Sequence, residues 1–164
     1  MQKREGIALV PGRFDPITLG HLDIIRRASE IYEHVIVAVM INPEKRYRFT
    51  IEERKEIAVS AVEDLPNVKV ISSEGMLWRL AEDLGATAIV KGVRNEIDRA
   101  YELAMAEYNN ARCEAVTVLW ESSPELEEIS STRVRECLER GESFCGYLPT
   151  GAIQVIEKII NKEK

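Results

Sequence analysis

A short stretch of the sequence, Pro11 to His21, combines glycine, proline, threonine and histidine as PGRFDPITLGH. It follows the apolar run Ile7–Val10 directly. Gly12 lets backbone approach a phosphate, and Thr18 can cap a helix whose first turn carries His21. A helix N-terminus favours anions through free N–H groups and its dipole, and a histidine there can donate a hydrogen bond to a phosphoryl oxygen. Taken singly, Gly12 or His21 is better explained by a turn before a surface helix, but the joint pattern predicts a nucleotide-phosphate site.

A basic segment, Asn42–Thr50, follows the apolar run Val35–Ile41. Arg46 and Arg48 are typical of a solvated loop, whereas Lys45 is the better candidate for a phosphate contact. Thr50 and Glu53 are three residues apart, the spacing of a helix cap in which each side chain bonds the other residue's backbone N–H.

Two later segments carry a similar chemistry. In Lys91–Arg94, KGVR, two cations flank a glycine that lets backbone lie against a ligand. Tyr101, Met105 and Asn109 follow at helical spacing, for which a packing face is the alternative explanation. In Ser130–Thr132, hydroxyl groups at a predicted helix start are good caps, and they can also cradle a phosphate.

Alternating strands and helices must position these residues. Five apolar runs rich in β-branched residues predict strands at Ile7–Val10, Val35–Ile41, Val68–Ile71, Thr87–Val90 and Ala115–Leu119. Amphipathic or capped stretches predict helices at Leu19–Tyr32, Ile51–Val62, Met76–Leu84, Glu96–Ala111, Ser131–Arg140 and Thr150–Ile160. This alternation predicts an α/β fold, a Rossmann-like single domain over residues 1–164 with a five-stranded parallel sheet flanked by helices. Ligands bind such sheets beyond the carboxyl ends of the strands, where all four segments lie.

Composition narrows the class of protein. The 164 residues carry a formal net charge of -6, which argues against a general nucleic-acid binder. The three cysteines have no metal or redox spacing, as expected of reduced thiols in a cytoplasmic protein. No apolar run is long enough to span a membrane, so we expect a cytoplasmic protein with no membrane or nucleic-acid partner.

The motifs together resemble one family. Thr18-Leu19-Gly20-His21 resembles the (H/T)xGH motif of the nucleotidyltransferase superfamily, and Ile129–Thr132 resembles its ISST motif. Phe49–Arg54 is similar to an FTxEER element, and Lys91–Asn109 is similar to the signature RGLRxxxDxxYExxMAxxN. These last two are typical of the bacterial phosphopantetheine adenylyltransferases, and the resemblance covers essentially the whole chain. Three places depart from that pattern: Arg13 replaces Ser or Thr, Lys91 replaces arginine, and the loop Ser122–Glu128 is unusually acidic.

The resemblance implies reversible transfer of AMP from ATP to 4′-phosphopantetheine. The products are dephospho-coenzyme A and pyrophosphate, in the penultimate step of coenzyme A biosynthesis. A phosphate oxygen attacks the α-phosphorus in line, so no Ser or Cys nucleophile is needed, and catalysis is positioning plus stabilisation of charge. Mg²⁺ is expected to bridge the ATP phosphates, held mainly by substrate oxygens and water, with no protein metal site. The resemblance also implies a homohexamer built as a dimer of trimers, which binds dephospho-coenzyme A and coenzyme A.

The resemblance also implies roles for individual residues. His21 is the catalytic residue, which stabilises the transition state at the α-phosphate. Phosphopantetheine is held by Arg13, Lys45, Leu77 and Lys91. From its own neighbourhood in the sequence, Leu77 is better explained as a core residue. ATP is held by Arg13, Phe14, His21, Gly92, Val93, Arg94, Glu102, Leu126, Glu127, Glu128, Ile129, Ser130, Ser131 and Thr132.

Two other functions remain open at this point. The first is adenylyl transfer to nicotinate or nicotinamide mononucleotide, because the first and last motifs are shared across the superfamily. The second is a catalytically weak nucleotide-binding relative, which Arg13, Lys91 and the acidic loop would favour. The intact Thr18–His21 motif, Lys45 and Arg94 argue against it.

Overall fold

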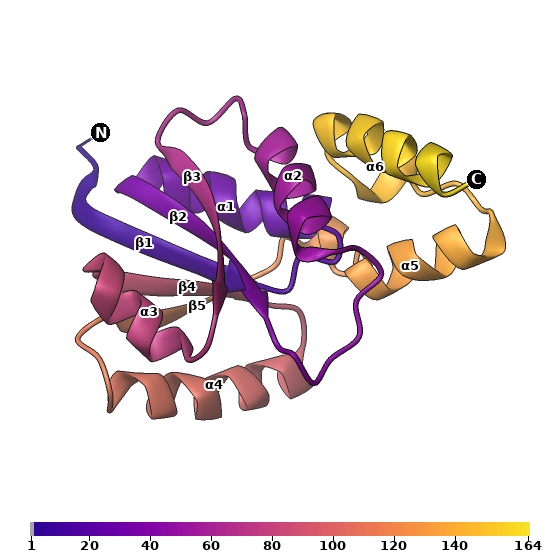
Figure 1. Cartoon of the computed structure of the whole chain (residues 1–164). Coiled ribbons are helices and arrows are strands. Elements are labelled where there is room, and N and C mark those ends of the chain that lie inside the picture. Colours follow the sequence, from indigo (N-terminus) through magenta and orange to yellow (C-terminus); the bar gives the residue numbers. More distant parts are fainter. Residues whose placement is uncertain (1) are drawn as a thin grey trace.

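Runs of β-branched and other apolar residues form a five-stranded parallel sheet in the computed structural model, which describes residues 2–164. The strand order is β3-β2-β1-β4-β5, and every neighbouring pair is parallel (Figure 1). The strands are β1 (Arg4–Gly12), β2 (Tyr32–Ile41), β3 (Val68–Glu74), β4 (Ala88–Val93) and β5 (Val116–Glu121). The predicted parallel sheet is confirmed, but its strands continue past the apolar runs because backbone groups, not side chains, form the ladder.

Six helices flank the sheet: α1 (Leu19–Ile31), α2 (Ile51–Ala61), α3 (Leu77–Leu84), α4 (Glu96–Asn110), α5 (Ser131–Arg140) and α6 (Thr150–Glu163). All six were expected, with ends that shift by up to three residues. The prediction that the first helix includes Tyr32 is wrong, because Tyr32 pairs with Arg4 and begins β2. Two short 3₁₀ turns, η1 (Pro124–Leu126) and η2 (Cys145–Tyr147), were not expected from the sequence.

Alternation along the strands sends side chains to two separate cores. Ala8 and Val10 of β1 face a large cluster that includes Ile25 of α1, Ile57 of α2 and Ile156 of α6. Leu9, between them, faces a smaller cluster that includes residues of α3. Helices α1 and α2 therefore cover one face of the sheet while α3 and α4 cover the other, as Figure 1 shows.

Helix α6 packs against α2 and not directly on the sheet (Figure 1). Gly151 makes the approach possible, because a Cβ at this position would overlap the carbonyl oxygen of Ser60. Ala152 and Ile156 are fully buried in the contact. The last helix, α6, is thus held against α2.

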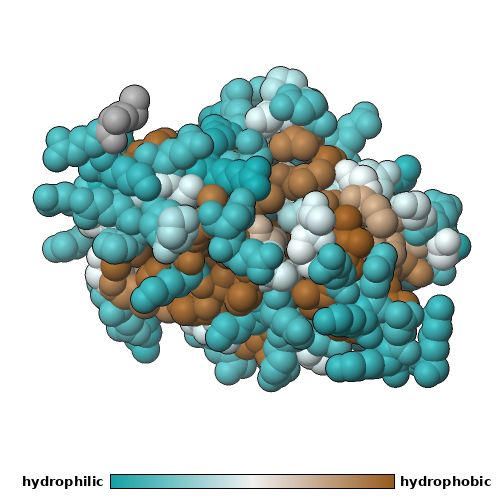
Figure 2. Space-filling view, turned by 90° about the horizontal axis from the view of Figure 1, so that it is seen from above, coloured by the Kyte–Doolittle hydropathy of each residue, from teal (hydrophilic) through white to brown (hydrophobic). Residues whose placement is uncertain are grey.

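The face of the molecule seen from above is largely polar (Figure 2). Seen from above, hydrophilic residues cover much of the face and hydrophobic residues gather between them (Figure 2). This fits a sequence in which 30% of residues are charged.

Candidate active site

A cavity of about 470 Å³ lies where the chain exits β1 and β4. These neighbouring strands mark the point where the strand order reverses, because β2 and β3 extend to one side and β5 to the other. Such switch points leave a crevice between diverging loops, which is the usual ligand site of an open parallel sheet. The predicted site residues that line the cavity are Arg13, Phe14, His21, Lys91, Gly92, Arg94, Glu102, Leu126, Ile129, Ser130, Ser131 and Thr132.

Five predicted site residues do not line this cavity. Lys45 lies on the loop between β2 and α2, beside a second, shallower hollow of about 380 Å³. Leu77 begins α3 and packs against the smaller core, as its own neighbourhood in the sequence predicts. Val93 is buried at the end of β4, and Glu127 and Glu128 are exposed after η1.

The loop after β1 is held by side chains that come from elsewhere in the chain. The buried Arg54 of α2 donates from Nη1 to the carbonyl oxygens of Arg13 (2.8 Å) and Met40 (3.2 Å). Arg135 of α5 donates to the carbonyl oxygen of Asp15 (2.9 Å). Phe14 has a φ of 46°, a left-handed conformation that a bulky residue rarely adopts. The surrounding contacts therefore impose the shape of this loop.

His21 is the third residue of α1 and takes part in the helix cap. Its Nδ1 accepts a hydrogen bond from the backbone N–H of Thr18 (3.0 Å), so Nδ1 carries no proton. Burial, followed by repulsion from Arg94, lowers the pKa of His21 from 6.5 to about 4. The ring is therefore neutral at pH 7, with its proton on Nε2. Since its Nδ1 is occupied by the cap, the neutral ring has one N–H to offer to a ligand.

Two cations at the exit of β4 are paired with carboxylates of α4. Lys91 Nζ lies 2.7 Å from Glu102 Oε2, and both side chains are 19% exposed. Arg94 Nε lies 3.3 Å from Asp98 Oδ2. Gly92 stands between the two cations, where a Cβ would come within 3.0 Å of Ile24 Cγ1. Backbone, and not a side chain, therefore faces the cavity between them.

The start of α5 forms another part of the cavity lining, through Ser130, Ser131 and Thr132. Ser130 caps the helix by accepting from the backbone N–H of Arg133 (3.1 Å). Ser131 Oγ donates to the carbonyl oxygen of Pro16 (2.7 Å), which ties this wall to the first loop. Arg135 also donates to Thr132 Oγ1 (3.0 Å). The helix start thus combines free N–H groups, hydroxyl groups and a guanidinium.

The acidic loop after β5 is fastened to α1. Arg27 donates to the carbonyl oxygen of Glu121 (2.9 Å) and lies over the ring of Trp120, at 5.2 Å from its centroid. Ser123 Oγ donates to Asp23 Oδ2 (2.9 Å). Within this loop Ser122 and Leu126 face the cavity. The loop is therefore a defined wall of the site despite its unusual sequence.

Sequence reasoning missed several residues of the site. Arg54 and Arg135 were overlooked because each lies inside a helix, far in sequence from the loop that it holds. Asp15 was assigned no role from the sequence, yet it is 3% exposed and accepts two backbone N–H bonds, from residues 48 and 49. The signal that could have indicated Arg54 is its place on the apolar side of a helix, where an arginine needs partners.

Residues 2–164 contain neither a cluster of metal ligands nor a helix suited to span a membrane. No cluster of three or more His, Cys, Asp or Glu side chains there converges as a set of metal ligands. None of the helices formed by these residues is both long enough and apolar enough to cross a membrane.

Comparison with known proteins places this geometry in context. Residues 9–137 match the model of the cytidylyltransferase-like family. The chain is 39% identical to the phosphopantetheine adenylyltransferase of Lachnoclostridium phytofermentans over 92% of this chain and 93% of that protein. It is 40% identical to that of Clostridium novyi, over 95% and 96% of the two chains. A crystal structure titled as a putative nicotinate-nucleotide adenylyltransferase from Vibrio parahaemolyticus has the same fold, with a TM-score of 0.69 at 20% identity, over 96% of this chain and 93% of the other.

Proposed function

This chain belongs to the cytidylyltransferase-like family and, within it, to the phosphopantetheine adenylyltransferases, and from this premise we propose that it transfers AMP from ATP to 4′-phosphopantetheine. The reaction yields dephospho-coenzyme A and pyrophosphate. The observation that carries the proposal is the meeting of His21, Lys91 and Arg94 in one cavity at the strand switch point. The Vibrio structure has a different title, but at 20% identity that likeness concerns the fold alone.

The chemistry requires positioned charge and no protein nucleophile. An oxygen of the acceptor phosphate forms a bond to the α-phosphorus, and the bond from that phosphorus to the bridging oxygen breaks as pyrophosphate leaves. In our proposal His21 Nε2–H donates to an oxygen of the α-phosphate, where negative charge grows in the transition state. The neutral ring suits this role because it donates without losing its proton.

The cations around the cavity neutralise the two anionic substrates in this proposal. Arg94 and the start of α5 take the triphosphate, Lys91 takes the acceptor phosphate, and Arg13 contacts both substrates. Glu102 and Asp98 hold the lysine and the arginine in the absence of substrate. An incoming phosphate must therefore compete with a carboxylate for each cation, which favours ligands with at least the charge of a phosphate.

Lys45 completes the acceptor site in this proposal. Its loop follows β2, the neighbour of β1, and its side chain is exposed. Leu77, at the start of α3, contacts the pantetheine arm. The ATP-binding side of the site is formed in this proposal by Phe14, Val93, Glu102 and the stretch from Leu126 to Thr132, which includes Glu127 and Glu128.

We also propose that Mg²⁺ accompanies ATP. Magnesium keeps much of its hydration and binds phosphate oxygens readily, so an ion that arrives with the nucleotide needs few protein ligands. The cavity is lined by cations and N–H groups, which suit the phosphates of ATP. The magnesium ion would therefore be bound mainly by oxygens of these phosphates. When bound, the ion supplies further neutralisation of the triphosphate charge.

The remaining proposals concern assembly and location. Resemblance to the family supports a homohexamer, and the absence of disulfide bonds among the three cysteines accords with a reducing cytoplasm. Light scattering on the purified protein tests the first of these. A mass six times the 18.6 kDa chain mass is expected, and a monomer in dilute buffer would contradict it.

Pyrophosphate release tests the proposed reaction directly. The purified protein is given ATP and Mg²⁺ with 4′-phosphopantetheine, with nicotinate mononucleotide, or with no acceptor. Pyrophosphate should appear only with phosphopantetheine, together with one equivalent of dephospho-coenzyme A. Release only with the mononucleotide would overturn the choice of acceptor. ATP binding without turnover on either acceptor would indicate a non-catalytic relative.

A further inference from the structure

The loop between β2 and α2, residues 42–50, is attached to two distant parts of the chain. The backbone N–H groups of Arg48 and Phe49 donate to the two carboxylate oxygens of Asp15, at 2.8 and 3.0 Å. The Arg48 guanidinium donates to both oxygens of Glu163 at the end of α6, at 3.0 and 2.8 Å. This two-pronged geometry defines the orientation of the side chains as well as their distance. Arg48 lies in a loop as the sequence predicts, but its partly exposed side chain is paired with Glu163.

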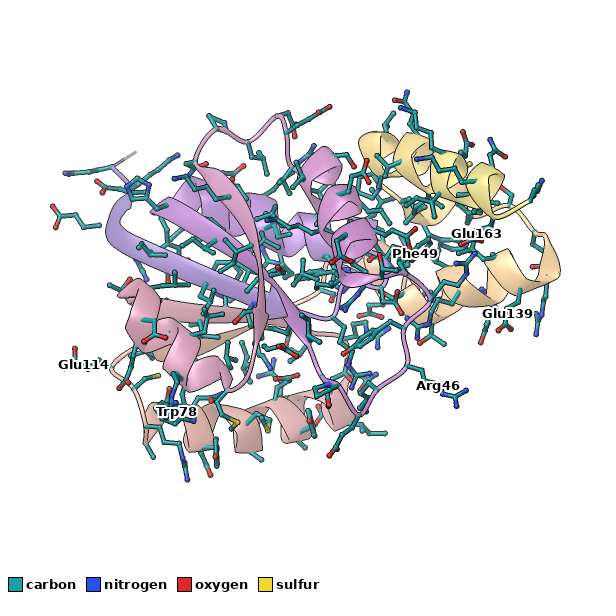
Figure 3. All side chains as sticks on the ribbon, in the orientation of Figure 1. Arg46, Phe49, Trp78, Glu114, Glu139 and Glu163 are labelled. Carbon is teal, nitrogen blue, oxygen red and sulfur yellow. The ribbon has the colours of Figure 1, made fainter. Side chains whose placement is uncertain are left out.

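The surroundings of the ion pair restrain it further. Arg48 lies over the ring of Phe49, at 4.9 Å from the centroid, and Phe49 itself is buried. The hydrogen bond from Arg48 holds the pKa of Glu163 below its ordinary value. In Figure 3 Phe49 and Glu163 lie on the same side of the molecule, whereas Arg46 of the same loop projects outward.

The other end of the attachment is the last residue of α6. Glu163 belongs to α6, which is packed against α2 through Gly151 and the buried Ala152 and Ile156. A side chain on a helix that is fixed to the core can hold a loop more firmly than one on a mobile segment. Glu163 thus connects the core layer to the loop.

The tip of the loop is braced by hydrogen bonds within residues 42–47. The carbonyl oxygen of Asn42 accepts from the backbone N–H of Lys45 (3.0 Å). The side-chain Oδ1 of Asn42 accepts from the backbone N–H of Glu44 (3.0 Å). Tyr47 Oη accepts from the backbone N–H of Asn42 at 2.9 Å. Because these bonds join residues 42–47 and Tyr47 directly precedes Arg48 in the chain, we expect the position of the tip to depend on the anchor at Arg48.

We propose that Glu163 is a positioning residue for the acceptor side of the active site. Through Arg48 it holds residues 42–50, and with them Lys45, in the orientation that presents the lysine to the acceptor phosphate. Glu163 touches neither substrate and acts only through Arg48. This inference rests on the proposed function, which assigns Lys45 to that phosphate.

The proposal makes a selective kinetic prediction. Without the ion pair the loop keeps its bonds to Asp15 but loses its outer attachment, so fewer molecules present Lys45 correctly. Glu163→Gln should raise KM for phosphopantetheine about two- to fivefold, the range expected for a partly exposed ion pair. kcat and KM for ATP should stay within error of the wild type. Glu157→Gln is the matched control, because Glu157 is exposed on the same helix and forms no ion pair within residues 2–164.

A double-mutant cycle identifies the partner. Arg48→Gln should raise KM for phosphopantetheine by a similar factor, and the Arg48→Gln/Glu163→Gln double variant should be no worse than either single variant. Raising NaCl to about 0.5 M should shrink the difference between wild type and Glu163→Gln, since salt screens the pair. Additive effects in the double variant would show that Glu163 acts by another route.

The failure of this inference is distinguishable from that of the proposed function. If the wild type releases no pyrophosphate with phosphopantetheine, the proposed function fails. If the wild type is active and Glu163→Gln matches Glu157→Gln, the positioning role is refuted. A parallel rise in KM for ATP, or a melting temperature more than about 4 °C below that of Glu157→Gln, would also refute it, since the loss would then exceed that of one partly exposed ion pair and the pair would support the fold as a whole.

Discussion

At the scale of single residues, the backbone N–H of Thr18 decides what His21 can do. Because Nδ1 of His21 is occupied as the acceptor of the helix cap, only Nε2–H is left to face the cavity. The low pKa of the ring, about 4, keeps it in that form across the neutral range. The same local structure that starts α1 therefore also prepares the donor.

His21→Ala should lower kcat roughly 10²- to 10³-fold, the cost of removing one preorganised donor. His34→Ala serves as the control, because His34 is the only other histidine and is exposed on β2. Pyrophosphate release at saturating substrates is the measurement. Near-normal turnover in a folded His21→Ala protein would remove the role assigned to His21.

Arg13→Ser should raise KM for both substrates, by up to about tenfold for loss of a charged hydrogen-bond donor. The side chain of Arg13 is exposed and borders the cavity, while its carbonyl oxygen is held by Arg54. The backbone should therefore stay in place when the side chain is shortened. Unchanged Michaelis constants would mean that the arginine side chain is a bystander and that backbone N–H groups make the contact.

At the scale of elements, the site is a set of loops tied to helices that are distant in sequence. Asp15 links the exit of β1 to the start of α2, Arg54 links α2 back to the exit of β1, and Ser131 links α5 to the same loop. Two of these ties use a backbone carbonyl of the loop and the third uses the Asp15 carboxylate, so none of them depends on the side chain of Arg13. This explains how Arg13 can occupy a position where the family carries a small hydroxyl residue.

Asp15→Ala should lower the free energy of unfolding by about 2–4 kcal/mol, because two backbone N–H groups lose their acceptor and one of them is buried. Asp64→Ala, which removes a half-exposed ion pair with Arg26, should cost less than about 1 kcal/mol. Urea unfolding measures both. Equal losses would show that Asp15 is not a structural link between the two loops.

Gly151→Ala should destabilise the protein by about 1–3 kcal/mol, because the added methyl group pushes α6 away from α2. Gly146→Ala places its methyl group in open space and should leave stability unchanged or raise it by less than about 1 kcal/mol. Thermal unfolding of the two variants is the comparison. Equal melting temperatures would mean that the helices can separate at no cost.

At the scale of the whole molecule, charge is unevenly distributed. The chain carries a net charge of -6, yet Arg13, Lys91, Arg94 and Arg135 converge on one cavity. An acidic protein thus presents a local cationic site to anionic substrates, and its overall charge gives no indication of it. The fold achieves this by bringing together the exits of strands that lie about eighty residues apart in the chain.

Acidification should lower stability through His21. The ring protonates near 6.5 when unfolded but only near 4 when folded, so between these values the unfolded state binds more protons. The free energy of unfolding therefore falls as the pH drops from 6.5 toward 4, and above 6.5 the contribution of His21 is constant. His21→Gln, which keeps an acceptor for Thr18 N–H, should lose less stability between pH 7.5 and 5 than the wild type. Identical losses by urea unfolding would contradict the low pKa.

Much of the fold was determined by the sequence alone. Apolar runs of strand length separated by amphipathic stretches specify a parallel α/β sheet, because only a sheet covered on both faces buries such runs. Caps such as Thr18, Thr50 and Ser130 placed the starts of α1, α2 and α5 at the observed residues. Local hydrogen bonding determines these features, so local sequence reveals them.

The composition of the site needed both levels. The residues of the Pro11–His21 and Lys91–Arg94 segments were found from their types and spacing, because the joint pattern of glycine and polar or cationic residues after a strand indicates a phosphate site where single residues do not. Only the tertiary structure brought Arg54 and Arg135 to the loop after β1 and Glu163 to the loop of residues 42–50. Only the tertiary structure showed that Lys45 lies apart from the main cavity. Such contacts join residues up to 120 positions apart, and their partners are set by helix packing. No local pattern encodes that packing, so the sequence alone could name the chemistry of the site but not the framework that holds it.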